Sequence, residues 1–327
     1  MTNRSSRAVS WIALSALLLA LAAAPPALAG EGGGSHYLPG SPGDFAMALI
    51  GPAGFYARND VVYFKGDIGS VTLGDRIYSS ASQDVWIDVL KLIWLAEGGI
   101  AGGRLGLVVT TPIVINAKVA GTLVSPFQRE ASGSRSGFSD VTLTSFLNWS
   151  FGNTHLSTGL SVFFPVGAYD ADRIINLGRN YWSFDPVIGF TWLDPKRGHE
   201  VSVNTGFMFN TTNEATNYSS GTEWHMDFLV GQHFSKRFAV GLAGSLLQGL
   251  TDDSGPLLVK ANVVLKALGL QPLGGFRAGY FGLGPSVVVT PKVWGKDLNL
   301  IAKYLFDVEH RNRFNSDYLT ISAVIKF

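Results

Sequence analysis

The sequence predicts an all-β protein: a transmembrane, antiparallel, up-and-down outer-membrane β-barrel of about 12 strands, with 10 or 14 as the alternatives. Three observations support this class. Apolar and polar residues alternate along many short segments, short and long connections alternate between those segments, and the chain ends in mid-strand on an aromatic residue. In that last segment, YLTISAVIKF, one face carries only apolar residues, namely Leu319, Ile321, Ala323, Ile325 and Phe327.

The composition indicates a surface that is not in contact with water alone. Hydrophobic residues make up 46% of the chain, which excludes intrinsic disorder, and charged residues make up only 15%, against roughly 25% in typical soluble domains. The net charge of +1, with no basic patch, gives no reason to expect nucleic acid as a partner. The absence of cysteine excludes disulfides and thiolate metal sites.

The N-terminal region has the layout of a cleavable secretory signal peptide over residues 1–29. Basic residues precede an apolar run, and Ala27-Leu28-Ala29 forms a small-x-small cleavage site. An uncleaved anchor is the alternative, which Pro25-Pro26 disfavours. We expect export to the bacterial outer membrane, a Gly- and Pro-rich segment over 30–53 that is a candidate lumen plug, and a barrel over 54–327.

Residues 141–169 carry no charged side chain and would be long enough for a membrane helix, but their pattern is that of strands. VTLTSFLNWS and LSTGLSVFF both alternate with a period of two, and the turn-prone FGNT lies between them. The same alternation predicts strands over 54–65, 84–95, 103–116, 139–151, 154–165, 182–193, 199–210, 221–234, 238–250, 275–290, 297–307 and 317–327.

Connection lengths support membrane insertion independently. Short links, such as 152–153 and 194–198, alternate with long ones at 66–83, 117–138, 166–181, 211–220, 251–274 and 308–316. Outer-membrane barrels place short turns at the periplasmic rim and long loops outside. The sheet must close, because an unpaired backbone group in hydrocarbon costs several kcal/mol. We therefore expect polar side chains inside, outer-membrane lipid outside, and an interfacial girdle of tryptophans, namely Trp86, Trp94, Trp149, Trp182, Trp192, Trp224 and Trp294.

A soluble β-sandwich also alternates, but it would carry more surface charge than this chain has. The aromatic terminal strand is similar to the segment by which the barrel-assembly machinery recognises outer-membrane proteins, which makes that machinery an expected partner.

Several longer stretches resemble one family. They are SHYLPGSPGDFAMALIGPAGFYARND at 35–60, FFPVGAYDADRIINLGRNYWSFDPVIGFTW at 163–192 and EWHMDFLVGQHFSKRFAVGL at 223–242, together with the last strand. They are similar to the outer-membrane proteins named for the meta-pathway of phenol degradation. The resemblance implies uptake of aromatic or other hydrophobic compounds that feed a degradation pathway. Residues 251–274 exceed the length expected of the family there, and we expect a lid helix or an extra hairpin.

Candidate residues for a solute path face the predicted lumen. They are Asp140, Asn148, His155, Asn204, Glu223, His225 and Asp227. Such residues also simply fill barrels with hydrogen bonds, which is the alternative interpretation. The even spacing of Glu223, His225, Asp227 and His233 follows from strand alternation alone, so we expect no metal site.

The loop PVGAYDADRIINLGRNY is a candidate constriction at the mouth of the barrel, through Tyr169, Asp170, Asp172, Arg173, Arg179 and Tyr181. A loop that pairs its own charges and packs on the rim is the alternative.

The expected function is an outer-membrane channel for small hydrophobic or aromatic solutes, without a cofactor. A structural or adhesive barrel is the first alternative. A barrel-embedded hydrolase is less well supported, because the sequence has neither a G-x-S-x-G elbow nor a phosphate-binding loop, and we do not expect an enzyme.

Overall fold

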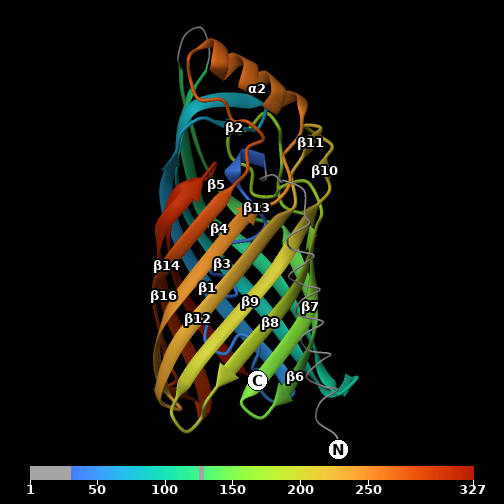
Figure 1. Cartoon of the computed structure of the whole chain (residues 1–327), viewed down its shortest axis with the longest axis vertical. Coiled ribbons are helices and arrows are strands. Elements are labelled where there is room, and N and C mark those ends of the chain that lie inside the picture. Colours follow the sequence, from blue (N-terminus) through green and yellow to red (C-terminus); the bar gives the residue numbers. More distant parts are fainter. Residues whose placement is uncertain (1–30, 125–128) are drawn as a thin grey trace, which may run out of the picture.

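The computed structural model describes residues 31–124 and 129–327, so the predicted signal peptide lies outside the described residues. Within them, twelve long antiparallel strands form a closed barrel (Figure 1). The strands are β1 (Gly54–Ile68), β3 (Arg76–Ile100), β4 (Gly103–Leu123), β6 (Val141–Phe151), β7 (Thr154–Phe164), β8 (Ser183–Leu193), β9 (His199–Asn210), β12 (Glu223–Ser235), β13 (Phe238–Gly249), β14 (Gly279–Val289), β16 (Lys296–Arg311) and β17 (Asn315–Lys326). The predicted fold class is confirmed.

The last strand closes the barrel by pairing with the first. β17 runs antiparallel to β1, from Tyr56 opposite Lys326 to Asp67 opposite Asn315. The backbone amide of Phe327 also donates to the carbonyl oxygen of Phe55, at 3.0 Å. Closure removes the free sheet edges that hydrocarbon would not tolerate.

Short elements occupy the connections. They are η1 (Glu31–Gly33), β2 (Val71–Leu73), β5 (Arg129–Phe138), β10 (Thr212–Asn213), β11 (Tyr218–Ser219), β15 (Lys292–Val293) and α2 (Pro256–Ala267). The region 251–274 therefore contains a helix and not an extra hairpin, which leaves the strand count at twelve. Among the described residues, no helix is long and apolar enough to cross a membrane.

Three predicted long loops are wrong in part. The range 308–316 contains the end of β16 and the start of β17, so that only 312–314 connects these strands. The ranges 66–83 and 117–138 contain β2, the upper part of β3, the upper part of β4 and all of β5. In this upper region β4 pairs with β5, whereas lower down it pairs with β6. β5, REASGSRSGF, has no apolar face. The sequence of β5 therefore has no alternation of apolar and polar residues that would predict a strand. β5 lies toward the end of the barrel that carries α2 (Figure 1).

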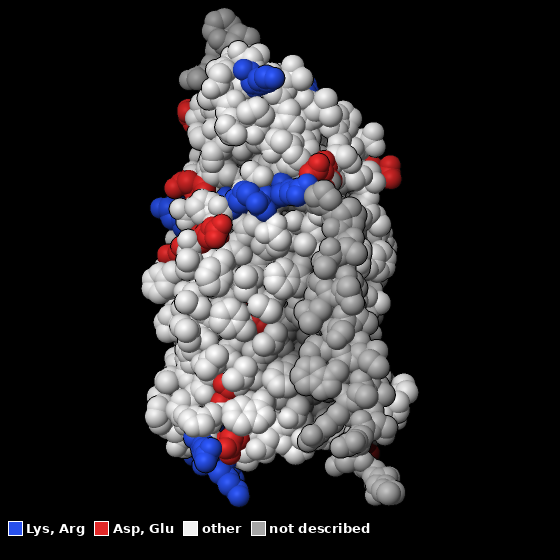
Figure 2. Space-filling view, in the orientation of Figure 1, with Lys and Arg blue, Asp and Glu red and all other residues white. Residues whose placement is uncertain are grey.

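The outer surface has the belt expected of a membrane protein. In Figure 2 a broad zone nearly free of charged side chains separates a charged band near the end that carries α2 from a smaller charged group at the opposite end. Large apolar side chains such as Leu92, Ile188 and Val230 are about half exposed on this wall. Two of the tryptophans predicted for an interfacial girdle contact a neighbouring ring at a tilt, Trp86 on Tyr63 and Trp182 on Phe164, with ring centroids 4.5 Å and 5.0 Å apart.

Side chains alternate between lipid and lumen as predicted on most strands. On β12, Met226 and Val230 face outward, while Glu223, His225 and Asp227 are buried inside. The inner faces of β3 and β4 differ from this rule. Most of their lumen-facing residues are apolar, although Gln83, Lys91 and Thr110 also line the cavity. Part of this apolar face packs against the loop between β7 and β8 in a cluster of Val85, Val114, Ala117, Ile175 and Leu177. The expectation of a polar lumen is therefore wrong on this side.

Candidate functional site

The segment that precedes β1 lies inside the barrel, where its dark blue trace runs between the strands (Figure 1). Tyr37 is 4% exposed and stacks on His225, with ring centroids 4.2 Å apart. Its hydroxyl donates to Asp227 at 2.7 Å and lies 2.8 Å from the hydroxyl of Ser245. An aromatic residue in the N-terminal segment thus fills the space beside the polar face of β12 and β13.

One end of the turn at residues 38–44 is fixed by a lysine from β16. The ammonium of Lys303 donates to the carbonyl oxygen of Gly40, to that of Gly43 at 2.8 Å, and to the carboxylate of Asp44 at 2.9 Å. All three donor positions of the ammonium are used. The lysine therefore holds a turn of the N-terminal segment against the barrel wall.

An ionic network extends from this turn across the first strands. Asp44 also pairs with Arg58 of β1. Arg58 in turn pairs with Asp60 at 2.6 Å, and Lys91 of β3 pairs with Asp60 at 2.9 Å. These four side chains are at most 15% exposed, so each charge depends on its partner.

The next residues of the segment bond to the opposite wall. The amide of Ala46 donates to Glu200 at 2.5 Å, and the amide of Ala48 donates to the hydroxyl of Thr191 at 2.9 Å. The carbonyl of Ala48 accepts from the side-chain amide of Asn148. Bonds to β6, β8 and β9 on one side and to β16 on the other suspend the segment across the lumen.

The mouth loop turns inward and is organised by Asp140. This carboxylate accepts from His36 at 2.9 Å, from the amide of Gly167 at 2.8 Å and from the amide of Arg179 at 2.7 Å. Burial opposes the charged form of Asp140, but the hydrogen bonds from His36 and the two amides outweigh it and hold the pKa of the carboxyl below its usual range. Asp140 thus joins the N-terminal segment to both ends of the loop.

The six residues predicted for the mouth separate into two groups. Asp170 pairs with Arg173 at 2.8 Å, and with Asp172 these residues lie toward the outside, as the alternative interpretation of a self-paired loop predicts. Tyr169 and Arg179 line the interior cavity. Tyr181 is 2% exposed and meets His36 edge-on, and burial raises the pKa of its hydroxyl.

The predicted lumen residues face inward, and the structure brings some of them together. Glu223, His225 and Asp227 share the inner face of β12, and His225 Nε2 lies 2.9 Å from Asp185 of β8. His155 lies elsewhere, with its ring 2.8 Å from the hydroxyl of Ser150 near a short turn. Of the seven, Asp140, Asn204 and His225 line the cavity; Asn148, His155, Glu223 and Asp227 do not.

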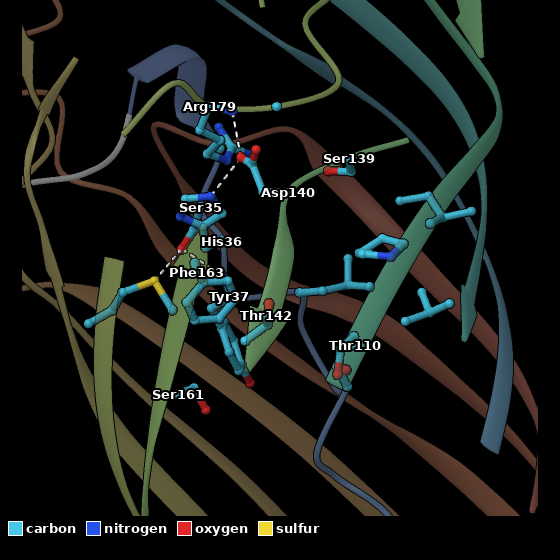
Figure 3. A pocket seen from close by; sticks show the side chains of 18 of the residues that line it. Ser35, His36, Tyr37, Thr110, Ser139, Asp140, Thr142, Ser161, Phe163 and Arg179 are labelled. Carbon is cyan, nitrogen blue, oxygen red and sulfur yellow. Dashed lines mark hydrogen bonds and ion pairs between the residues drawn. The ribbon is translucent and has the colours of Figure 1, made fainter. Parts of the chain in front are cut away.

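A cavity of about 640 Å³ lies between the N-terminal segment and the wall formed by β3, β4, β6 and β7. Figure 3 shows His36, Asp140 and Arg179 at one end of it, with Thr142, Ser161 and Phe163 along one side. The other side is apolar and consists mainly of Val85, Ile87, Val89, Ile93, Val108 and Val114. The cavity therefore has one apolar wall and one polar wall.

The apolar wall is the functional feature that reasoning from the sequence missed. The alternation of the other strands predicts only polar inward-facing candidates, whereas β3 and β4 carry apolar residues on both faces over VWIDVLKLIW and GLVVTTPIV. A strand that loses its alternation while its neighbours keep theirs faces something apolar on both sides. That loss was readable and would have indicated an apolar lumen wall.

The arrangement of the polar side chains bears on two types of chemistry, metal binding and nucleophilic catalysis. Among the described residues, no cluster of His, Asp and Glu is placed to hold a metal ion. Ser183, His36 and Asp140 form a hydrogen-bonded chain in the order of a catalytic triad. However, Ser183 has no exposed surface, and its hydroxyl donates to Asn210, so no substrate reaches a free nucleophile there.

A solved outer-membrane channel has the same fold as this chain. The COG4313 outer membrane channel from Pseudomonas putida F1 superimposes with a TM-score of 0.65 at 15% identity, over 87% of this chain and 99% of that one. A Pseudomonas aeruginosa FadL homologue gives a TM-score of 0.41 at 10% identity, over 93% and 99% of the two chains. No curated protein matches the chain in sequence.

The family resemblance noted in the sequence is confirmed by a family model that matches residues 66–323. The matched range runs from the end of β1 to the last strand and includes the mouth loop and both walls of the cavity. The chain belongs to the family described as "Putative MetA-pathway of phenol degradation".

Proposed function

We propose that this protein is an outer-membrane channel that admits small hydrophobic or aromatic compounds through the cavity beside the N-terminal segment. The observation that carries this proposal is the apolar inner wall of β3 and β4, which faces an internal cavity of about 640 Å³. A volume of this size lies within the range of about 300–1,000 Å³ found for small-molecule sites. A barrel built only for hydrophilic solutes would have no use for such a wall.

The two walls together fit a solute with an apolar body and a polar substituent. An aromatic ring gains by leaving water for the surface of Val85, Val89 and Val114, while a hydroxyl group can bond to Thr142 or Ser161 across the cavity. Phe163 offers a ring face on the polar side. Simple phenols have this combination.

The N-terminal segment is proposed to act as a plug against larger and more hydrophilic solutes. Its bonds to Lys303, Glu200 and Thr191 hold it across the lumen, and it supplies Met47 and Ile50 to the cavity. Deletion of residues 31–50 is expected to raise ion conductance in planar bilayers severalfold, because the segment occupies a large part of the lumen. Unchanged conductance and unchanged solute uptake would remove the plug from the proposal.

The test of transport uses substitutions in the apolar wall. Val89 and Val114, 6% exposed each, are both changed to Thr, which keeps the shape and adds a hydroxyl group to each. The matched control is Val62→Thr, which is also buried and inward-facing but lies outside the cavity lining. Initial uptake of a labelled aromatic solute at low concentration is measured in cells that lack the native gene.

The double variant is expected to take up the solute severalfold more slowly than the control, since a polar wall binds an aromatic ring less well. Equal rates for both variants would contradict passage through this cavity. If loss of the whole gene leaves uptake unchanged, the structural or adhesive barrel becomes the better interpretation.

A further inference from the structure

Arg313 is a buried cation in the wall of the cavity, in the connection between β16 and β17. The residue is 7% exposed. Its Nη2 lies 3.4 Å from the hydroxyl of Tyr318, and the centre of the guanidinium lies 5.9 Å from the ring centroid of Tyr280. Among the described residues, Nε and Nη1 have no acceptor, and no carboxylate lies within ion-pair distance of the guanidinium.

A buried guanidinium with unfilled donors is an unusual arrangement. Arginine stays charged in proteins, so it cannot avoid the cost of burial by losing its proton. Buried charges are normally paired, because desolvation is expensive. Contact with the face of Tyr280 offsets part of this cost, but it supplies no acceptor for Nε or Nη1. An anionic ligand would supply one.

A second arginine lines the same end of the cavity. A β-carbon at Gly34 would lie 2.2 Å from Nη2 of Arg179, and one at Gly33 would lie 3.5 Å from the Cα of Arg313. Gly34 therefore lies against the guanidinium of Arg179, and Gly33 lies against the backbone of Arg313. Figure 3 shows Arg179 at the end of the cavity, above His36.

The carboxylates near this end do not remove the need for an anion. Asp140 already accepts three hydrogen bonds, from His36, Gly167 and Arg179. Glu223 attracts Arg313 through space, but one of its oxygens accepts from Ser35 and the other has no partner. Neither carboxylate accepts a hydrogen bond from the guanidinium of Arg313.

We propose that Arg313 binds the carboxylate of an amphipathic organic acid whose apolar body lies against the β3 and β4 wall. The proposal rests on the proposed function and narrows its solute class to aromatic or alkyl carboxylates. Carboxylates form strong, charge-assisted hydrogen bonds with guanidinium groups.

The test measures binding to the whole protein held in amphipol, by equilibrium dialysis, with empty amphipol as the blank. The probes are phenylacetate, the isosteric neutral phenylacetamide and the cationic phenethylammonium. The unmodified protein is expected to bind phenylacetate about tenfold more tightly than the amide, the difference expected for one charge-assisted hydrogen bond, and the ammonium most weakly.

Variants test whether the preference for phenylacetate over phenylacetamide depends on Arg313. Arg313→Gln is expected to abolish this preference, because it weakens the binding of phenylacetate about tenfold and the binding of phenylacetamide less than twofold. Glu223→Gln removes a repelling charge and should strengthen phenylacetate. Arg277→Gln, at an exposed arginine paired with Asp252 outside the cavity, is the matched control and should change neither.

If Arg313→Gln does not fold, the binding of the three probes to the unmodified protein still tests the carboxylate site. Equal binding of acid and amide, or tighter binding of the ammonium, overturns the carboxylate site and leaves the channel proposal standing. Binding of none of the probes above the blank overturns both.

Discussion

Lys303 is the residue on which the position of the N-terminal segment most clearly depends. It is 3% exposed, and its ammonium contacts two carbonyl oxygens and one carboxylate of the turn at residues 38–44. Removing one partner of a buried ion pair costs about 3–5 kcal/mol, because the other partner is left without its counter-charge. Asp44 retains Arg58, but the two carbonyl groups retain nothing comparable.

Lys303→Met is therefore expected to detach this turn and raise the ion conductance of the protein in planar bilayers. Methionine keeps the length of the side chain and removes its three donors. Lys296→Met, at an exposed position on the same strand, is the control and should leave conductance unchanged. If both variants conduct like the unmodified protein, the lysine does not hold the segment in place.

Individual residues were predictable where a local pattern governed them. Strand alternation alone placed His225 and Asp227 inside the barrel, and the structure agrees. The contact between Lys303 and Asp44 joins positions 259 residues apart, and no spacing in the chain indicates it. No local pattern predicts the burial of Arg313 either, since it depends on the N-terminal segment and on β14.

At the scale of elements, α2 covers the end of the barrel that carries the long loops (Figure 1). Leu258, Ala261 and Leu265 face inward with at most 4% exposure, at the spacing of one helix face. They pack against Tyr218 and Phe276 in a cluster above the barrel. Val259 and Val263 on the opposite face are about two-thirds exposed.

Leu265→Ala is expected to loosen this helix by about 2–5 kcal/mol, because it removes a buried side chain and leaves a cavity. Val263→Ala, at an exposed position two residues earlier in the helix, should stay within about 0.5 kcal/mol of the unmodified protein. Hydrogen exchange of the α2 amides measures both. Equal protection in the two variants would show that the buried face does not hold the helix down.

Elements were predictable in proportion to how strictly they alternate. Strands that face lipid on one side and polar groups on the other, such as β7 and β9, were placed almost to the residue. The upper parts of β3 and β4 and all of β5 were predicted as loops, and the sequence of β5 has no alternation of apolar and polar residues that would predict a strand. The sequence of 251–274 does not decide between a helix and a hairpin, because PLLVKANVVLKA has apolar residues at the spacing of a helix and at the spacing of a strand.

On the scale of the whole molecule, the lumen of the barrel has two halves with different contents. One half of the lumen is occupied by the N-terminal segment and its polar partners on β9, β12, β13 and β16. The other half holds the cavity against the apolar wall of β3 and β4. The low charge content and the alternating last strand predict a lipid-facing outer surface and a closed sheet. The inside depends on contacts between distant segments, which composition and periodicity do not encode.

The absence of cysteine from the chain permits a direct test of solute passage through the cavity. Val89→Cys places a single thiol on the apolar wall, and Leu90→Cys places one on the lipid-facing side of the same strand. The measurement is the rate at which a small maleimide labels each thiol, with and without saturating para-cresol. We predict that the solute slows labelling of Val89→Cys severalfold and leaves Leu90→Cys unchanged. Equal labelling of Val89→Cys in both conditions would contradict the account.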